Sequence, residues 1–139
     1  MNQIILASHG GLAAGAKDTL EMVLGDVSNV HVVSLARDDK EPITNKVDAM
    51  IATFNADDTV YVLTDMLGSS VNNNMVELSK NGTKFTVVSG FNIPLALTLA
   101  MSPVPVEGAE LAALINEARN GLTNPNAPAQ PAAAPAKKA

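Results

Sequence analysis

Apolar residues in this chain form short continuous runs that alternate with stretches where they recur every three or four positions. The runs cover residues 4–7, 30–35, 59–64 and 85–88, and the later ones are rich in β-branched residues. Short apolar runs of this kind predict buried strands. Between and after them, helical spacing of apolar residues predicts five helices. The first covers about 11–24, the second begins at Ile43, the third lies between the Gly68-Ser69-Ser70 turn and Asn81-Gly82, and the last two cover 93–101 and 107–121.

Each predicted helix carries an apolar face that a sheet can cover. Pro42 suits the first turn of the second helix, and Gly25 and Gly82 stand where helices commonly end. The apolar positions are Leu12, Ala16, Leu20, Val23 and Leu24 in the first helix, Ile43, Val47, Met50, Ile51 and Phe54 in the second, Val71, Met75 and Leu78 in the third, and Leu111, Leu114, Ile115 and Ala118 in the last.

The alternation of strands and helices predicts the fold class. Strand-helix-strand units are connected right-handed, so the chain is expected to form an α/β fold, a doubly wound, mainly parallel four-stranded sheet of order 2-1-3-4 with helices on both faces. Residues 102–106 contain two prolines and are expected to be extended, as an edge strand. We expect one domain over residues 1–122, followed by an Ala/Pro-rich linker or tail over 123–139.

Composition narrows the classes of function. The 139 residues suffice for one core, 47% are apolar and none is cysteine, which excludes disulfides and thiolate chemistry. A net charge of −5 argues against nucleic acid as a partner. No apolar run reaches the length of a membrane span and the first residues lack a basic signal, so a cytoplasmic protein is expected.

Candidate chemistry lies where two predicted strands end. His9 follows the first strand and Asp65 the third, and in the order 2-1-3-4 these strands are neighbours, so the two side chains are expected to meet at the carboxyl edge of the sheet. A carboxylate that accepts the imidazole Nδ1–H leaves Nε2 with a free lone pair. We therefore predict that His9 attacks a phosphoryl group and that Asp65 orients His9.

The glycines and serines beside this pair are candidates for holding the phosphoryl group. Gly10 follows His9, and Gly68, Ser69 and Ser70 open the third helix, where backbone N–H groups and the helix dipole favour an anion. The Ser70 hydroxyl can donate directly. The chemistry requires no metal, and the sequence offers no cluster of metal ligands.

Less specific interpretations exist for several of these residues. Asp65 can simply cap the third helix, a role that is compatible with orienting His9. His31 is interpreted as an ordinary surface residue, on the solvent face or at the edge of the sheet. Met66 and Leu67 stand at a strand-helix tip, where they either face a partner or are exposed without function.

Four sequence blocks together resemble one protein family. They are Ser-His-Gly-Gly at 8–11, Glu-Met-Val-Leu-Gly at 21–25, Thr-Asp-Met-Leu-Gly-Ser-Ser at 64–70 and Gly-Phe-Asn-Ile-Pro at 90–94. With them the chain resembles the IIA component of the mannose family of the bacterial phosphoenolpyruvate-dependent sugar phosphotransferase system (PTS).

The resemblance implies a phosphocarrier that works through a covalent phosphohistidine and needs no cofactor. His9 is expected to accept the phosphoryl group from the phosphorylated histidine protein HPr and to pass it to a histidine of a IIB component, while the membrane components IIC and IID are involved only indirectly. Asp65 matches the orienting aspartate, and Ser70 matches a serine beside the phosphoryl group. The resemblance also implies a homodimer that exchanges the segment at about 102–106.

The chain departs from the family pattern in one loop. The family usually has Gly-Gly-Ser-Pro where this chain has Gly68-Ser69-Ser70-Val71, so the second glycine and the proline are lost. Ser69 keeps its N–H, from which we expect the anion-binding turn to survive. The tail resembles the Ala-Pro linker that joins IIA to IIB in some members.

Other functions fit the residues less well. A two-component receiver needs an acidic pair after its first strand, where this chain has Ser8-His9, and a serine hydrolase built on Ser70 lacks Gly-x-Ser-x-Gly. The phosphocarrier subunit of dihydroxyacetone kinase shares the fold and the histidine, but the block at 90–94 and the loop after Asp65 favour the sugar branch. A regulatory module that has lost transfer disagrees with the intact His9 and Asp65.

Overall fold

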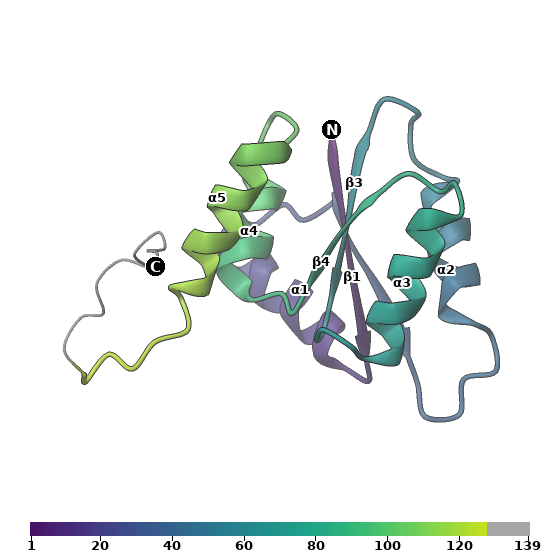
Figure 1. Ribbon diagram of the computed structural model, residues 1–139, viewed down its shortest axis with the longest axis horizontal. Helices are drawn as coiled ribbons and strands as arrows, with labels where there is room; N and C mark the ends of the chain where they lie inside the picture. The colour runs from purple at the N-terminus through teal and green to yellow at the C-terminus, as the bar shows by residue number, and fades with distance from the viewer. Residues whose placement is uncertain (128–139) are drawn as a thin grey trace. The chain divides into compact units, whose positions relative to one another are not determined.

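The computed structural model describes residues 1–127, so most of the predicted tail lies outside the described residues. They fall into two compact units, one ending at Pro105 and one beginning at Val106. The first unit contains β1 (Asn2–His9), α1 (Leu12–Leu24), β2 (Val30–Leu35), α2 (Ile43–Ile51), β3 (Thr59–Thr64), α3 (Ser70–Lys80), β4 (Thr86–Ser89) and α4 (Ile93–Met101), and the second contains α5 (Gly108–Arg119) (Figure 1).

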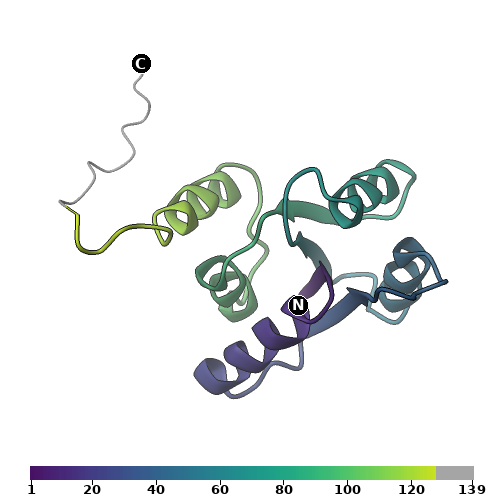
Figure 2. The same ribbon diagram turned by 90° about the horizontal axis from the view of Figure 1, so that it is seen from below.

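The first unit is a parallel four-stranded sheet between two layers of helices. Its strand order is β2-β1-β3-β4, which confirms the predicted fold class and order. Helices α1 and α4 pack on one face and α2 and α3 on the other (Figures 1 and 2). The register of the two central strands places Ala7 opposite Thr64, so both strands end at the same edge of the sheet.

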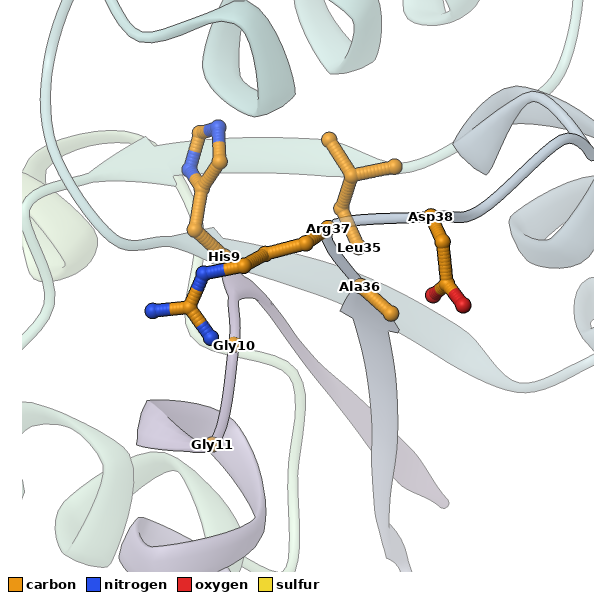
Figure 3. A pocket seen from close by; sticks show the side chains of 7 residues that line it. All are labelled: His9, Gly10, Gly11, Leu35, Ala36, Arg37 and Asp38. Atoms are coloured by element: carbon orange, nitrogen blue, oxygen red, sulfur yellow. The ribbon is translucent and has the colours of Figure 1, made fainter.

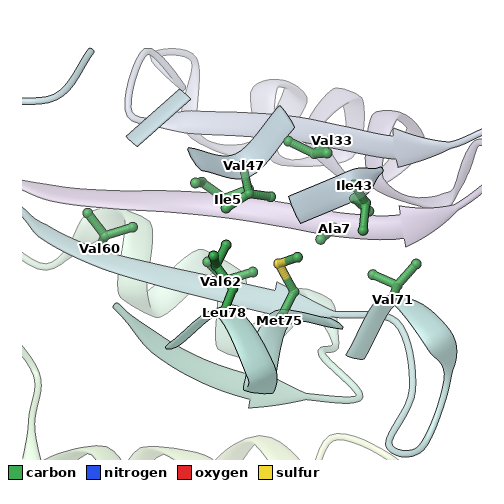
Figure 4. Close-up of a cluster of buried hydrophobic side chains, with 10 residues drawn as sticks. All are labelled: Ile5, Ala7, Val33, Ile43, Val47, Val60, Val62, Val71, Met75 and Leu78. Carbon is green, nitrogen blue, oxygen red and sulfur yellow. The ribbon is translucent and has the colours of Figure 1, made fainter. Parts of the chain in front are cut away.

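The core explains why the strands are apolar without interruption. Ile5 and Ala7 belong to the cluster that α2 and α3 cover, where Val47 and Met75 are fully buried (Figure 4). Ile4 and Leu6 alternate with them along β1, so they point to the other face, and they too have no exposed surface. A strand covered on both faces must be apolar at every position.

Most predicted elements are confirmed, but the buried face of α1 differs from the expectation. Leu12 and Val23 were expected to be on the apolar face, yet they are 55% and 62% exposed. Ala13 is completely buried instead, on the same face as the buried Ala16 and Leu20. The small alanines allow the helix to approach the sheet closely. In α2 the helix ends at Ile51, and Phe54 packs against the core from the turn that follows.

Residues 102–106 do not form the predicted edge strand within the single chain. The Asn2 side chain holds the beginning of this stretch, because its Nδ2 donates hydrogen bonds to the carbonyl oxygens of Ser102 and Val104 at 3.3 and 2.8 Å. The sheet ends at β4. Among the described residues, no helix has both the length and the apolar character needed to cross a membrane.

Candidate functional site

The carboxyl ends of β1 and β3 bring His9 and Asp65 into direct contact, as the strand order predicts. Nδ1 of His9 lies 2.8 Å from Oδ2 of Asp65, and the backbone N–H of His9 donates to the same oxygen at 2.9 Å. Because one carboxylate oxygen accepts from both the backbone and the ring, the imidazole is fixed in position and in orientation.

The second oxygen of Asp65 is also occupied. Oδ1 accepts the backbone N–H of Met66 at 2.9 Å and the hydroxyl of Ser69 at 3.0 Å. Burial acts to raise the pKa of Asp65, but the hydrogen bonds from His9, Ser69 and Met66 outweigh it and hold that pKa below its ordinary value. Asp65 is therefore a carboxylate that acts only as an acceptor.

The tautomer of His9 follows from this partner. An ionised carboxylate accepts only, so Nδ1 carries the proton and Nε2 carries the lone pair. Nε2 lies 3.2 Å from the hydroxyl oxygen of Ser70, which is then the donor. The His9 side chain is 46% exposed and the Asp65 side chain 10%, so the imidazole is open to solvent while the carboxylate that holds it is largely covered.

Ser69 caps α3 and takes part in the turn before it. Its side chain accepts the backbone N–H of Asn72 at 3.1 Å, and its own N–H donates to the Met66 carbonyl at 3.2 Å. The alternative in which Asp65 caps α3 is thus wrong, since the cap is Ser69. The Ser69 N–H, predicted to face an anion, is committed to the turn instead. Gly68 adopts a φ of 84° there, a conformation that favours glycine.

The start of α1 is held by a residue that the sequence analysis did not single out. Gly10 has a φ of 56° and donates its N–H to the Leu35 carbonyl at 3.0 Å. Gly11 precedes the helix without a side-chain cap. The fully buried Ser8 supplies this cap from the strand, because its hydroxyl accepts the Ala13 N–H at 2.9 Å. His9 therefore lies between two fixed neighbours.

A second overlooked group lies beneath the site. The Asn72 side chain is almost completely buried, and its Oδ1 accepts the hydroxyl of Thr64 at 2.6 Å and the hydroxyl of Ser89. These bonds join the ends of β3 and β4 to the first turn of α3. The signal in the sequence was a polar residue on the apolar side of a helix, next to Val71.

An open cavity of about 780 Å³ lies beside His9 (Figure 3). It is lined by His9, Gly10, Gly11, Leu35, Ala36, Arg37 and Asp38. The loop after β2 is braced by Asp39, which accepts the Lys46 ammonium at 2.6 Å and the Ala36 N–H at 3.0 Å. These two bonds, that of Lys46 first, lower the pKa of Asp39. The described residues contain no cluster of side chains that could hold a metal ion.

The expectation for His31, which lies away from the His9–Asp65 pair, is corrected. His31 lies on the edge strand, as expected, but it is half-buried rather than an ordinary surface residue. Its Nε2 lies 2.7 Å from Oε1 of Gln3, and its ring contacts Phe54 at 4.9 Å between centroids. Burial, together with the nearby Lys17 charge, lowers the pKa of His31. Met66 and Leu67 are 59% and 80% exposed on the loop that follows β3.

Comparison with known proteins agrees with this geometry. Residues 3–118 match the model of the EIIA-man family, described as the PTS system fructose IIA component. The chain belongs to the EIIA-man family. As an EIIA component of the mannose family it is a phosphocarrier of a sugar phosphotransferase system. The match runs from the second residue of β1 to the penultimate residue of α5 and includes the strand ends that carry His9 and Asp65.

Individual relatives of this EIIA protein come from several bacteria. It is 27% identical over 101 residues to the sorbose-specific EIIA component of Lacticaseibacillus casei, with 72% of each chain covered. It is 29% identical over 100 residues to the mannose-specific EIIAB component of Escherichia coli, covering 71% of this chain but 31% of that longer protein. The structure of a PTS IIA protein associated with the fucose utilization operon of Streptococcus pneumoniae superposes with a TM-score of 0.75 and 31% identity, covering 88% and 92% of the two chains.

Proposed function

We propose that His9 carries a phosphoryl group on Nε2, taking it from phosphorylated HPr and passing it to a histidine of a IIB component during uptake of a mannose-class sugar. The observation that carries the proposal is the contact of 2.8 Å between Nδ1 of His9 and Oδ2 of Asp65. This contact leaves the lone pair on Nε2 of a half-exposed ring, where an incoming phosphorus atom can approach.

In the transfer the bond between phosphorus and the donor histidine breaks as a bond to Nε2 of His9 forms. The His9 ring gains positive charge as its lone pair attacks, and the Asp65 carboxylate stabilises this charge through Nδ1–H. Phosphoryl transfer passes through a loose transition state, so positioning and charge stabilisation supply most of the catalysis. The acceptor histidine of IIB then attacks the same phosphorus and the bond to Nε2 breaks.

Ser70 and the start of α3 support the phosphoryl group in this proposal. The Ser70 hydroxyl already lies 3.2 Å from Nε2, so it can turn its donated hydrogen bond from the nitrogen to a phosphoryl oxygen. The positive end of the α3 dipole also stabilises the negative charge of the phosphoryl oxygens. Gly10 keeps side chains away from the entering group, and the φ of 84° at Gly68 shapes the loop.

Both partners must reach the same nitrogen, so they use the same side of the molecule in turn. Met66 and Leu67 are exposed on the loop directly after Asp65, and Leu12 is exposed at the start of α1, close in sequence to His9. Exposed apolar residues around a reactive group are typical of a docking surface. We assign Met66 and Leu67 to the contact with HPr and IIB.

The decisive experiment incubates the protein with phosphoenolpyruvate, enzyme I and HPr and searches for an acid-labile, alkali-stable adduct. The chain has only two histidines, so the matched variants are His9→Ala and His31→Gln, the latter keeping a polar group beside Gln3. We expect full labelling of the wild type and of His31→Gln and none of His9→Ala. A wild type without label, or a labelled His9→Ala, contradicts the proposal.

The proposal includes a homodimer. The sheet of the single chain ends at β4 (Thr86–Ser89), and residues 102–106, which form no strand within the chain, can pair with the corresponding edge of a second copy. Sedimentation should then report twice the chain mass of 14.4 kDa. A monomer at micromolar concentration contradicts this part and leaves the phosphocarrier role unaffected.

A further inference from the structure

Ser69 makes a chain of hydrogen bonds whose direction can be deduced without locating its hydrogen atom. The backbone N–H of Asn72 can only donate, so the Ser69 oxygen accepts there, at 3.1 Å. The Asp65 carboxylate can only accept, so the single hydroxyl proton of Ser69 points to Oδ1, at 3.0 Å. The helix cap and the carboxylate are therefore joined through one hydroxyl group.

This hydroxyl completes the set of donors around Asp65. A carboxylate has about four lone-pair positions, and they are used by the His9 N–H, His9 Nδ1, the Met66 N–H and the Ser69 hydroxyl. Two of these donors belong to His9 itself and one to the residue next to Asp65. Ser69 is the donor among the four that links the carboxylate to a separate element, α3.

The element to which Ser69 is joined is firmly held. Asn72, whose N–H binds the Ser69 oxygen, is almost completely buried. Its side chain accepts the hydroxyls of Thr64 and Ser89, at the carboxyl ends of β3 and β4. A group supported by packed and hydrogen-bonded elements keeps its geometry better than one supported by a loop alone.

We infer that Ser69 is a positioning residue for phosphoryl transfer, which holds the Asp65 carboxylate in the plane that directs Nδ1–H of His9 and exposes Nε2. The inference rests on the proposed function of His9. It gives Ser69 a role other than direct binding of the phosphoryl group, since both its N–H and its hydroxyl are used within the protein.

Three variants separate this role from that of a helix cap. Ser69→Ala removes both the cap and the donor. Ser69→Asp keeps an acceptor for the Asn72 N–H, and aspartate is a good cap, but it has no proton for Asp65. Ser69→Thr keeps the hydroxyl and is the conservative control.

The readouts are the NMR titration of the Asp65 carboxyl carbon, the rate of phosphoryl uptake from phospho-HPr, and the thermal midpoint. In Ser69→Ala we expect the pKa of Asp65 to rise toward its ordinary value, because a donor to the charged form is lost. Uptake should slow about tenfold, with the half-saturating concentration of phospho-HPr unchanged. Loss of a group that orients a functional histidine through a hydrogen bond has an effect of this size in metal sites. Ser69→Asp should slow uptake at least as much, because it removes the donor and places a second negative charge beside Asp65, and Ser69→Thr should restore the wild-type rate.

Some results overturn the inference. If Ser69→Ala loses only thermal stability, with the Asp65 titration and the uptake rate unchanged, Ser69 is a cap and nothing more. Wild-type uptake by Ser69→Asp has the same meaning. A wild-type protein that takes no label on His9 overturns the proposed function instead, and the Asp65 titration still decides whether Ser69 holds the carboxylate.

Discussion

Replacing Asp65 by asparagine tests the site because the carboxylate receives donors on both oxygens. An amide keeps one acceptor oxygen and places an NH2 group at the other position. With the oxygen toward His9, the NH2 group faces the Met66 N–H and the Ser69 hydroxyl. In the opposite orientation it faces the His9 N–H and Nδ1, which moves the ring proton to Nε2 and blocks the nucleophile. Either orientation leaves at least one backbone N–H without an acceptor, that of Met66 or that of His9.

The size of the effect follows from the bond at Nδ1. A hydrogen bond to a charged group contributes about 1.5–3 kcal/mol, and this bond strengthens as the His9 ring becomes positive during attack. At about 1.36 kcal/mol per factor of ten, its loss slows phosphoryl uptake roughly 10- to 150-fold. The His9 side chain is 46% exposed, so solvent screening places the expected value toward the lower end.

Rapid-quench measurement of phosphoryl uptake from phospho-HPr gives the rate directly. Asp57→Asn is the matched control, because it makes the same chemical change at an exposed aspartate before the amino end of β3. Circular dichroism and urea denaturation verify that both variants are folded. Uptake by Asp65→Asn at the wild-type rate, or an equal loss in Asp57→Asn, would refute the reasoning.

Three further predictions concern the core, the partner surface and acid stability. Met75→Ala should lower the free energy of unfolding by about 2–5 kcal/mol, since Met75 has no exposed surface, whereas Met22→Ala, at 85% exposed, should change it by less than about 0.5 kcal/mol in urea denaturation. Leu67→Ser should raise the half-saturating concentration of phospho-HPr about tenfold without affecting stability, and Leu122→Ser, at 88% exposed, should leave both unchanged. The pKa of Asp65 is held below 3.8, so its stabilising effect is complete above that value and is lost as the pH falls through the lower folded pKa. Urea denaturation from about pH 6 to about pH 2 should therefore show a larger loss for the wild type than for Asp65→Asn, and parallel curves would contradict this.

The strands were predictable because burial on both faces leaves a simple signature. The apolar runs at 30–35 and 59–64 coincide with β2 and β3, since polar residues bound them closely. The buried face of α1 was harder to predict, because two adjacent faces of this helix carry similar numbers of apolar residues. Large residues at Leu12 and Val23 favoured one stripe, while the structure buries the smaller Ala13. Periodicity does not show how closely a helix approaches the sheet.

The candidate site was predictable as far as strand order determines it. His9 ends β1 and Asp65 directly follows β3, and these strands are neighbours, so the strand order alone predicts that the two residues are close. The hydroxyl groups of Ser8 and Ser69 could not be assigned in the same way, because a serine can accept or donate toward several backbone groups. Their partners depend on loop angles such as the φ of 84° at Gly68, which the residue types permit without requiring.

The parallel register of β1 and β3 restricts where residues can be inserted or deleted during evolution. Ala7 lies opposite Thr64, and each further residue advances a strand by about 3.3 Å and turns its side chain to the opposite face. A deletion of one residue within β1 would thus retract His9 and rotate it away from Asp65. Insertions and deletions should therefore be tolerated in turns such as 55–58, whereas the two central strands can change length only together.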